Sequence, residues 1–257
     1  MKLKGQVALV TGAGRNIGKA MVKLFASEGA RIAVAEAHQG RGQSVVTELE
    51  KMGHEAMLVL CDVSKSAEVQ QMVQKVVERF GRIDILVNNA ALTDHASLLE
   101  SSEEEFDNVI RVTLKGPYVV AKCVAAQMVK QGGGKIVNLG STSGMVGRAD
   151  GIAYAAAKGG VINMTRAMAV QLSPYKIRVN CLTPNRSGSP VGMDDTETES
   201  RSFNNLAGRV GTAEDQARAA LFLVSGDSDF VYGANLVVDG GAMATANFPK
   251  NQFTKDK

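Results

Sequence analysis

The feature that most constrains the fold is a regular alternation of short apolar runs with amphipathic segments along the 257 residues. Two of the runs, Gln6–Thr11 (QVALVT) and Ile83–Asn88 (IDILVN), are almost continuously apolar and do not alternate with polar residues. Continuous runs are typical of strands that are buried on both faces, as in a parallel sheet covered by helices. Repeated β-α units join such strands by right-handed crossovers. The sequence therefore predicts an α/β protein with a single doubly wound, Rossmann-like domain.

The expected strands are Gln6–Thr11, Arg31–Glu36, Glu55–Val63, Ile83–Asn88, Lys135–Leu139, Arg178–Leu182 and Asn235–Val238. The expected helices are Asn16–Glu28, Arg41–Met52, Ser66–Phe80, a long helix from a capping box at Ser102 and Glu105 towards Gln131, Ile152–Leu172 and Glu214–Val224. A long polar stretch, Pro184–Leu206, is expected to be a substrate lid at about residues 184–206, because long loops in compact domains are usually functional. We expect one domain over residues 1–246 and a C-terminal tail over 247–257.

Charge and cysteine content narrow the function classes. Lys and Arg number 29 and Asp and Glu 26, a net charge of +3 without a basic stripe, so no nucleic-acid partner is expected. No apolar run approaches the about 20 residues of a membrane span, and the N-terminus has no signal-peptide pattern. Cys61, Cys123 and Cys181 lack CxxC spacing, which indicates a reducing compartment and no metal site. A cytoplasmic protein without a membrane partner is predicted.

A glycine-rich turn follows the first expected strand and opens a helix, over Thr11–Gly18 (TGAGRNIG). Glycines let the backbone approach a ligand closely, and the helix N-terminus presents free N–H groups to a phosphate. Glu36 lies about twenty residues further on, where a carboxylate accepts hydrogen bonds from an adenosine ribose and repels a 2′-phosphate. The combination predicts a dinucleotide site.

Tyr154 and Lys158 lie four positions apart on an expected helix, so their side chains share one face. A nearby ammonium favours the phenolate, and we therefore expect Lys158 to lower the pKa of Tyr154 and make it a general acid/base. Ser141 follows an expected strand, at the edge of the sheet where ligands bind, and could donate a hydrogen bond to a substrate oxygen.

In these motifs the chain resembles the short-chain dehydrogenase/reductase family, with a TGxxxGxG-like turn and a YxxxK pair. Further segments that match in order and spacing are Cys61–Val63, Asn88–Ala91, Lys135–Asn138, Ser141, Ile177–Asn180, Arg209–Gly211 and Val238–Gly241. The resemblance implies a seven-stranded parallel sheet, a nicotinamide cofactor and a homotetramer.

The resemblance also implies roles for individual residues. Tyr154 would donate or accept the proton, Lys158 would hold the nicotinamide ribose, and Ser141 would orient the substrate. The implied cofactor-binding residues are Gly12, Arg15, Asn16, Ile17, Gly18, Glu36, Asp62, Val63, Asn89, Tyr154, Lys158, Ser187 and Ser189. Glu36 indicates NAD, whereas Arg15 is a feature of NADP enzymes, and we give Glu36 the greater weight.

Five positions depart from the family pattern, one of them being Ala91 in place of a glycine. Asn16 replaces the middle glycine of the turn, although Asn tolerates positive φ better than most residues. Thr113 stands in VIRVTLKG at the position of the fourth catalytic residue, an asparagine that holds a helix kink and a proton-relay water. Asn185 replaces a glycine, and Ser189 matches a threonine that reaches the carboxamide.

The substrate pocket is expected to be formed by the loops around the site, with Thr93, Asp94, His95, Met145, Arg148, Asn185 and Arg186. Arg148 and Arg186 raise the hypothesis of an anionic substrate group, because guanidinium binds carboxylates bidentately. We favour the alternative that both are solvated loop arginines.

The predicted function is an NAD(H)-dependent oxidoreductase that interconverts a secondary alcohol and a ketone. Two alternatives remain open from the sequence. One is a cofactor-binding protein with weak or no catalysis, suggested by the altered Thr113, Asn16 and Asn185. The other is an epimerase or dehydratase that recycles bound NAD.

Overall fold

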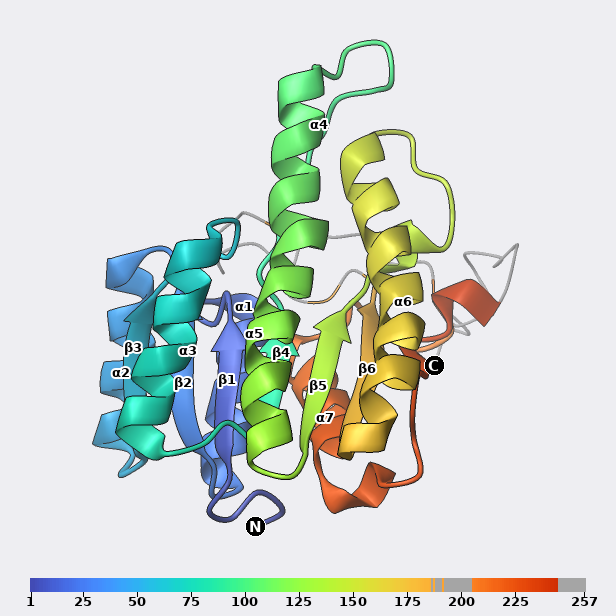
Figure 1. Cartoon of the computed structure of the whole chain (residues 1–257). Coiled ribbons are helices and arrows are strands. Elements are labelled where there is room, and N and C mark those ends of the chain that lie inside the picture. The colour runs from blue at the N-terminus through green and yellow to red at the C-terminus, as the bar shows by residue number, and fades with distance from the viewer. Residues whose placement is uncertain (186, 188–190, 192–204, 245–257) are drawn as a thin grey trace.

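The structure, a computed structural model, describes residues 1–185, 187, 191 and 205–244. Within these residues seven strands form one parallel sheet in the order β3-β2-β1-β4-β5-β6-β7 (Figure 1), which confirms the predicted fold class. The strands are β1 (Val7–Thr11), β2 (Arg31–Glu36), β3 (Ala56–Leu60), β4 (Ile85–Asn88), β5 (Gly134–Leu139), β6 (Ile177–Pro184) and β7 (Asn235–Val238).

Helices cover both faces of the sheet. One face packs against α1 (Asn16–Ser27), α2 (Gln39–Lys51) and α7 (Ala213–Val224), and the other against α3 (Ser66–Phe80), α5 (Gly116–Lys130) and α6 (Ile152–Leu172). Strand β1 shows why its sequence is continuously apolar. Ala8 and Val10 belong to the core on the first face, while Val7 and Leu9 belong to the core on the second.

The long helix predicted to run from Ser102 towards Gln131 is interrupted by one wider turn. It begins as α4 (Glu103–Ile110), passes through a π-helical turn at Arg111–Lys115 and continues as α5, so that α4 extends beyond the carboxyl ends of the strands (Figure 1). Ser102 caps the start, because its Oγ accepts a hydrogen bond from the Glu105 N–H at 3.1 Å. Such π turns are frequent at functional sites.

Most predicted element ends agree with the structure to within two residues, which is the usual spread. The exception is β3, which ends at Leu60 and not at Val63. Asp62 ends the strand by forming a turn, since its Oδ1 accepts from the Ser64 N–H at 3.0 Å and its carbonyl accepts from the Lys65 N–H at 3.0 Å. An aspartate that bonds its own backbone in this way competes with strand pairing.

Candidate active site

A cleft of ≈ 520 Å³ opens at the carboxyl ends of the strands, where β1 and β4 lie side by side and the strand order reverses. Ligands of open α/β sheets bind at this point. The predicted cofactor-binding residues that line it are Gly12, Arg15, Asn16, Ile17, Gly18, Glu36, Asp62, Val63, Asn89, Tyr154 and Lys158. Residues that are up to 146 positions apart in the sequence therefore meet at one cavity, from Gly12 to Lys158.

The glycine-rich turn is tightly packed at Gly18. A Cβ at this position would lie 2.7 Å from Asn89 Nδ2 and 2.9 Å from Ala13 Cα, and it would also collide with the Gly12 carbonyl oxygen. Asn89 closes the turn, because its Nδ2 donates to the carbonyls of Thr11 at 3.0 Å and Gly12 at 2.9 Å. Only a residue without a side chain fits at Gly18.

The N-terminus of α1 suits a phosphate. The side chain of the N-cap residue Arg15 forms no capping hydrogen bond, and the first turn of α1 holds no acidic residue. Residues 15–18 line the cleft, so the N-terminal end of α1 and the positive end of its dipole lie at the cleft. Helix N-termini of this kind bind phosphate groups. The residues present here therefore fit the pyrophosphate of a dinucleotide.

Asn16 has the positive φ that the sequence led us to expect for this position, at 48°. We predict that Asn16→Ala unfolds at a lower temperature than Asn16→Gly. Both variants lose the amide side chain, but only alanine has a Cβ that opposes the left-handed conformation, by about 1 kcal/mol. Thermal unfolding of the two variants side by side measures the difference. Equal melting temperatures, or a more stable alanine variant, would contradict this interpretation of the turn.

Glu36 is held at the end of β2 by backbone donors. Its Oε2 accepts from the Gly14 N–H at 2.9 Å, and its Oε1 accepts from the N–H groups of Ala37 at 3.1 Å and His38 at 3.2 Å. The carboxylate thereby joins the end of β2 to the glycine-rich turn. The same end of the cleft is lined by two cations, Arg15 and Arg41.

Lys158 is buried, with 3% of its surface exposed, and its Nζ donates to the Leu139 carbonyl at 2.6 Å. Burial lowers the pKa of the Lys158 ammonium to about 8. The same Nζ lies 5.6 Å from the centroid of the Tyr154 ring. The predicted juxtaposition of the two side chains on one helix face is present.

The direction of the pKa shift of Tyr154 differs from our expectation. Burial raises the pKa of the phenol, and the hydrogen bond with the Ser141 side chain and the positive charge of Arg148 oppose that rise without overcoming it. Tyr154 is 6% exposed, and the buried phenolate would be poorly solvated. Our expectation that Lys158 lowers the pKa of Tyr154 is therefore wrong for the protein without a cofactor. The loss of hydration on burial raises this pKa by more than the neighbouring positive charge lowers it.

Thr113 lies at the centre of the π-helical turn and is fully buried. Its Oγ1 accepts a hydrogen bond from the Leu92 N–H at 2.9 Å and donates one to the Leu92 carbonyl at 2.8 Å. The Thr113 hydroxyl therefore forms hydrogen bonds with both backbone polar groups of Leu92, in the loop after β4. Thr113 does not border the cleft itself.

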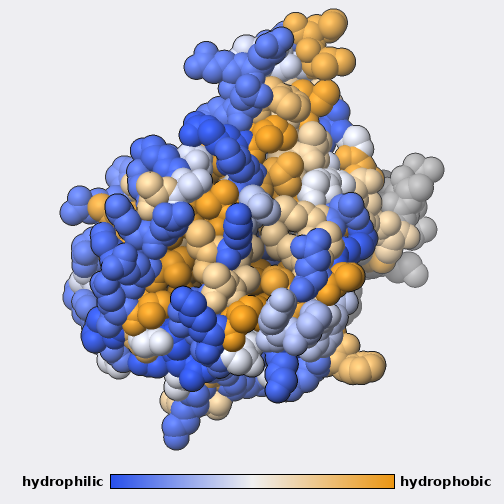
Figure 2. All heavy atoms as spheres, viewed as in Figure 1, coloured by the Kyte–Doolittle hydropathy of each residue, from blue (hydrophilic) through white to orange (hydrophobic). Residues whose placement is uncertain are grey.

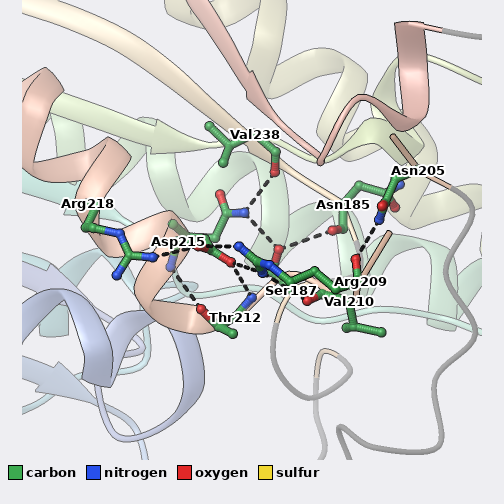
Figure 3. A network of polar contacts seen from close by, with 10 residues as sticks. Asn185, Ser187, Asn205, Arg209, Val210, Thr212, Asp215, Arg218 and Val238 are labelled. Atoms are coloured by element: carbon green, nitrogen blue, oxygen red, sulfur yellow. Dashed lines mark hydrogen bonds and ion pairs between the residues drawn. The ribbon is translucent and has the colours of Figure 1, made fainter. Parts of the chain in front are cut away.

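Ser187 does not line the cleft either. Its Oγ donates to the Asn185 carbonyl at 3.1 Å and accepts from Gln216 Nε2 at 2.8 Å (Figure 3). Gln216 also donates to the Val238 carbonyl at 2.8 Å. The hydroxyl is therefore part of the network that joins the segment after β6 to α7 and β7. Ser189 and Arg186 lie outside the described residues, as does most of the expected lid.

The residues expected in the substrate pocket have different positions. His95 is exposed, and Asp94 is buried away from the cleft against the start of α6. Arg148 lies over the Tyr154 ring, with its Cζ 5.6 Å from the ring centroid, and forms an ion pair with Asp150 at 2.9 Å. Arg148 is thus more than a solvated loop arginine, because it contacts the tyrosine.

Several residues that line the cleft were missed in the sequence. Arg41 lies five positions after Glu36, in the first turn of the helix that follows β2, and that placement was a usable signal. Arg111 lies in the π-helical turn, and its guanidinium donates to Ser64 Oγ at 2.7 Å and Asn108 Oδ1 at 2.6 Å. No local pattern marks Arg111, because the turn that carries it is not visible in the sequence.

Across the described ranges, His, Cys, Asp and Glu side chains form no group of three or more that could hold a metal ion. In the same residues no helix combines the length and the apolar character that crossing a membrane requires.

Several known proteins are similar to this chain over nearly its whole length. A family model described as enoyl-(acyl carrier protein) reductase matches residues 12–243. The chain is 38% identical over 243 residues to the 3-oxoacyl-(acyl-carrier-protein) reductase FabG of Thermotoga maritima, which covers 94% of this chain and 99% of that protein. Among solved structures, NAD+-bound xylitol dehydrogenase has a TM-score of 0.86 and 32% identity, over 94% of this chain and 100% of that chain.

A gluconate 5-dehydrogenase from Burkholderia cenocepacia, in complex with NADP and tartrate, has a TM-score of 0.88 and 32% identity, over 95% of this chain and 97% of that chain. These matches span nearly the whole chain and include the turn, the cleft and the Tyr154 region. The chain belongs to the short-chain dehydrogenase/reductase family, a class of oxidoreductases.

Proposed function

We propose that the protein is an NAD(H)-dependent oxidoreductase that interconverts a secondary alcohol and a ketone. The observation that carries the proposal is the placement of Tyr154 and Lys158 in the cleft whose other end is formed by the glycine-rich turn. Ser141 reaches the same phenol through a hydrogen bond. A proton-transfer group and a dinucleotide-binding turn thereby share one cavity.

The chemistry divides between cofactor and protein. A bound nicotinamide supplies hydride transfer to or from the carbinol carbon. Tyr154 gives a proton to the substrate oxygen during ketone reduction and takes it back during alcohol oxidation. Ser141 donates a hydrogen bond to that oxygen as negative charge develops on it. The Lys158 ammonium would hold the nicotinamide ribose and would stabilise the phenolate that remains after Tyr154 has given its proton.

The preference for NAD over NADP rests on Glu36. Its carboxylate is held at the cleft by three backbone N–H groups, where it can accept from ribose hydroxyls and repel a 2′-phosphate. Arg15 and Arg41 at the same end are the opposing feature, since arginine binds phosphate. The two related structures hold one cofactor each, NAD+ in xylitol dehydrogenase and NADP in gluconate 5-dehydrogenase.

Titration of the purified protein with NADH and with NADPH tests the cofactor assignment, and we expect NADH to bind more tightly. A stopped-flow screen of secondary alcohols, hydroxy acids, polyols and 3-oxoacyl thioesters then tests hydride transfer. Cofactor binding without transfer to any member of the panel would favour a protein that only binds the cofactor. Substrate turnover without net change in NADH would favour an epimerase or dehydratase.

The pH dependence of ketone reduction provides a further prediction. In this direction Tyr154 acts as an acid, and its raised pKa keeps it protonated over the range measured. Lys158, with a pKa of about 8, is cationic below that pH and neutral above it. We therefore expect kcat/KM, which reports groups of the free enzyme, to fall as the pH rises through about 8. In Lys158→Arg the charge persists, so the fall should vanish from the remaining activity. A fall that survives this substitution would contradict the assignment to Lys158.

We also propose a homotetramer in the cytoplasm. Apolar side chains gather over the helices in front of the sheet (Figure 2). The exposed large apolar side chains of α4, α5 and α6 are Phe106, Tyr118, Val129 and Val170. Exposed apolar patches mark interfaces. The three cysteines are free thiols, which agrees with a reducing compartment. Size-exclusion chromatography with light scattering should give four times the chain mass.

A further inference from the structure

The start of α6, which carries Tyr154, is capped from a distant part of the chain. Gly151 precedes the helix in the left-handed conformation, with φ 68°, and no side chain of its own neighbourhood caps the first turn. The cap comes from Asp94, in the loop after β4. Its Oδ2 accepts from the Ala153 N–H at 3.0 Å, and its Oδ1 accepts from the Tyr154 N–H at 2.9 Å. One carboxylate therefore holds two successive N–H groups, including that of the tyrosine itself.

This carboxylate is deeply buried, with 1% of the Asp94 surface exposed. A buried carboxylate is retained only where it is well paired, and here the pairing consists of backbone donors and the positive end of a helix dipole. The cap is a tertiary contact, because 59 and 60 residues separate Asp94 from its two donors. Its geometry therefore links the loop after β4 directly to the catalytic helix.

The loop that carries Asp94 is itself anchored on both sides. On one side Thr113 pins the N–H and the carbonyl of Leu92, two residues before Asp94. On the other side the Gly151 N–H donates to the Ala96 carbonyl at 3.1 Å, two residues after it. A Cβ on Gly151 would lie 2.9 Å from the Asp94 carbonyl oxygen, so loop and helix start are in close contact. Hydrogen bonds therefore connect the loop after β4 both to the π-helical turn and to the start of α6.

We propose that Asp94 is a positioning residue for Tyr154: its carboxylate fixes the first turn of α6 and thereby the place of the phenol beside Ser141 and Lys158. The proposal rests on the proposed function, in which Tyr154 transfers the proton. Thr113 extends the same support through Leu92 to the π-helical turn. Displacement of a reacting group by about 1 Å can cost about 10²-fold in rate, so the position of this turn matters for catalysis.

Asp94→Asn is the direct test, with Asp84→Asn as the matched control. The asparagine keeps the size of the side chain and one acceptor oxygen, but it turns an amide NH₂ towards the second backbone N–H. Asp84 is also a buried carboxylate, and its Oδ2 accepts from the Val7 N–H at 2.9 Å, but it lies at the opposite end of β4 from the cleft. Asp84 also forms an ion pair with Arg82 at 2.6 Å, so Asp84→Asn weakens an ion pair and a backbone hydrogen bond at the end of the sheet opposite to the cleft.

We expect Asp94→Asn to lower kcat by about 10- to 100-fold, with KM and the Kd for NADH changed by less than about threefold. Asp84→Asn should lose thermal stability but keep kcat when it is assayed well below its melting temperature. Unchanged kcat in Asp94→Asn would overturn the proposal. Equal loss of kcat in the two variants would overturn it as well, because a general loss of stability would then explain the effect.

A second measurement needs no substrate. The chain has four tyrosines and no tryptophan, and Tyr118, Tyr175 and Tyr232 are exposed while Tyr154 is buried, so tyrosinate absorbance can follow Tyr154 when the curve of Tyr154→Phe is subtracted. In the wild type the Tyr154 step should lie above the ordinary pKa of a tyrosine, since burial raises its pKa. In Asp94→Asn that step should move to lower pH, because a loosened first turn admits water to the ring. An unmoved step would overturn the proposal.

The kcat measurement depends on the proposed function, whereas the tyrosinate titration does not. A failure of this proposal can therefore be distinguished from a failure of the proposed function on which it rests. If the wild-type protein transfers no hydride to any substrate of the panel, the proposed function fails, and the titration alone decides whether Asp94 positions the tyrosine. If Asp94→Asn does not fold, the same two measurements are made on Asp94→Ser, which keeps a hydroxyl acceptor, and the same criteria apply.

Discussion

Tyr154→Phe is expected to lower kcat by about 10³-fold while the Kd for NADH changes by less than about twofold, because general acid/base groups contribute 10²–10⁴ in rate. The substitution removes one oxygen and leaves the buried ring in place. The hydroxyl of Tyr154 is the group that hydrogen-bonds with Ser141, whereas its ring packs with Ala153 and Val109. Proton transfer is therefore lost, and the fold of the helix start is kept.

The measurement combines single-turnover hydride transfer with fluorescence titration of NADH. Tyr175→Phe serves as the control, since Tyr175 is an exposed tyrosine in the 3-10 turn after α6, at the end of that helix far from the cleft. It should retain wild-type kcat. Full activity of Tyr154→Phe on a good substrate would remove the mechanism, and a large loss of NADH binding would show that the phenol acts mainly in cofactor recognition.

Gly18→Ala should weaken NADH binding by at least about tenfold, which corresponds to about 1.4 kcal/mol. The added methyl group would collide with the Gly12 carbonyl and approach Asn89 Nδ2 to 2.7 Å, so the glycine-rich turn and the start of α1 must separate. This movement displaces the N–H groups that are proposed to hold the pyrophosphate. The fold itself should lose about 1–3 kcal/mol of stability, as overpacked sites do.

Gly40→Ala is the matched control. Gly40 also lies in the first turn of a helix, α2, but a Cβ there would meet nothing closer than 3.8 Å. Alanine should therefore keep NADH affinity and raise stability slightly, by about 0.4–1 kcal/mol. Isothermal titration and thermal unfolding of both variants measure the two effects. Normal NADH affinity in a folded Gly18→Ala protein would argue against the turn as the pyrophosphate site.

Much of the fold could be predicted because the sequence features that indicate it are local. The strands are continuous apolar runs since each is covered on both faces, and α6 was predicted with its observed bounds, Ile152–Leu172. The positive φ of Asn16 and the alignment of Tyr154 with Lys158 follow from a few neighbouring residues. Such features depend on the period of a helix or the chemistry of a turn, which short stretches of sequence determine.

Other features depend on groups that are far apart in the chain. The raised pKa of Tyr154 comes from burial by several elements, and no spacing within α6 reveals it. Arg111 enters the cleft only because the π-helical turn that carries it lies there. Ser187 is directed to Gln216 by the packing of α7 against β7 and not to the cleft.

The amino-acid sequence alone was sufficient to predict the layered sheet. It also led to the proposals of a phosphate-binding turn and of a proton-transfer pair, whose residues line one cleft in the structure. The folded chain alone determined how that pair is held: Asp94 caps the helix of Tyr154 across 60 residues, and Thr113 anchors the same loop across 21. The physical reason is the separation along the chain over which each kind of interaction acts. Periodicity and turn chemistry act between near neighbours, whereas burial and long-range hydrogen bonds exist only once the distant segments have packed together.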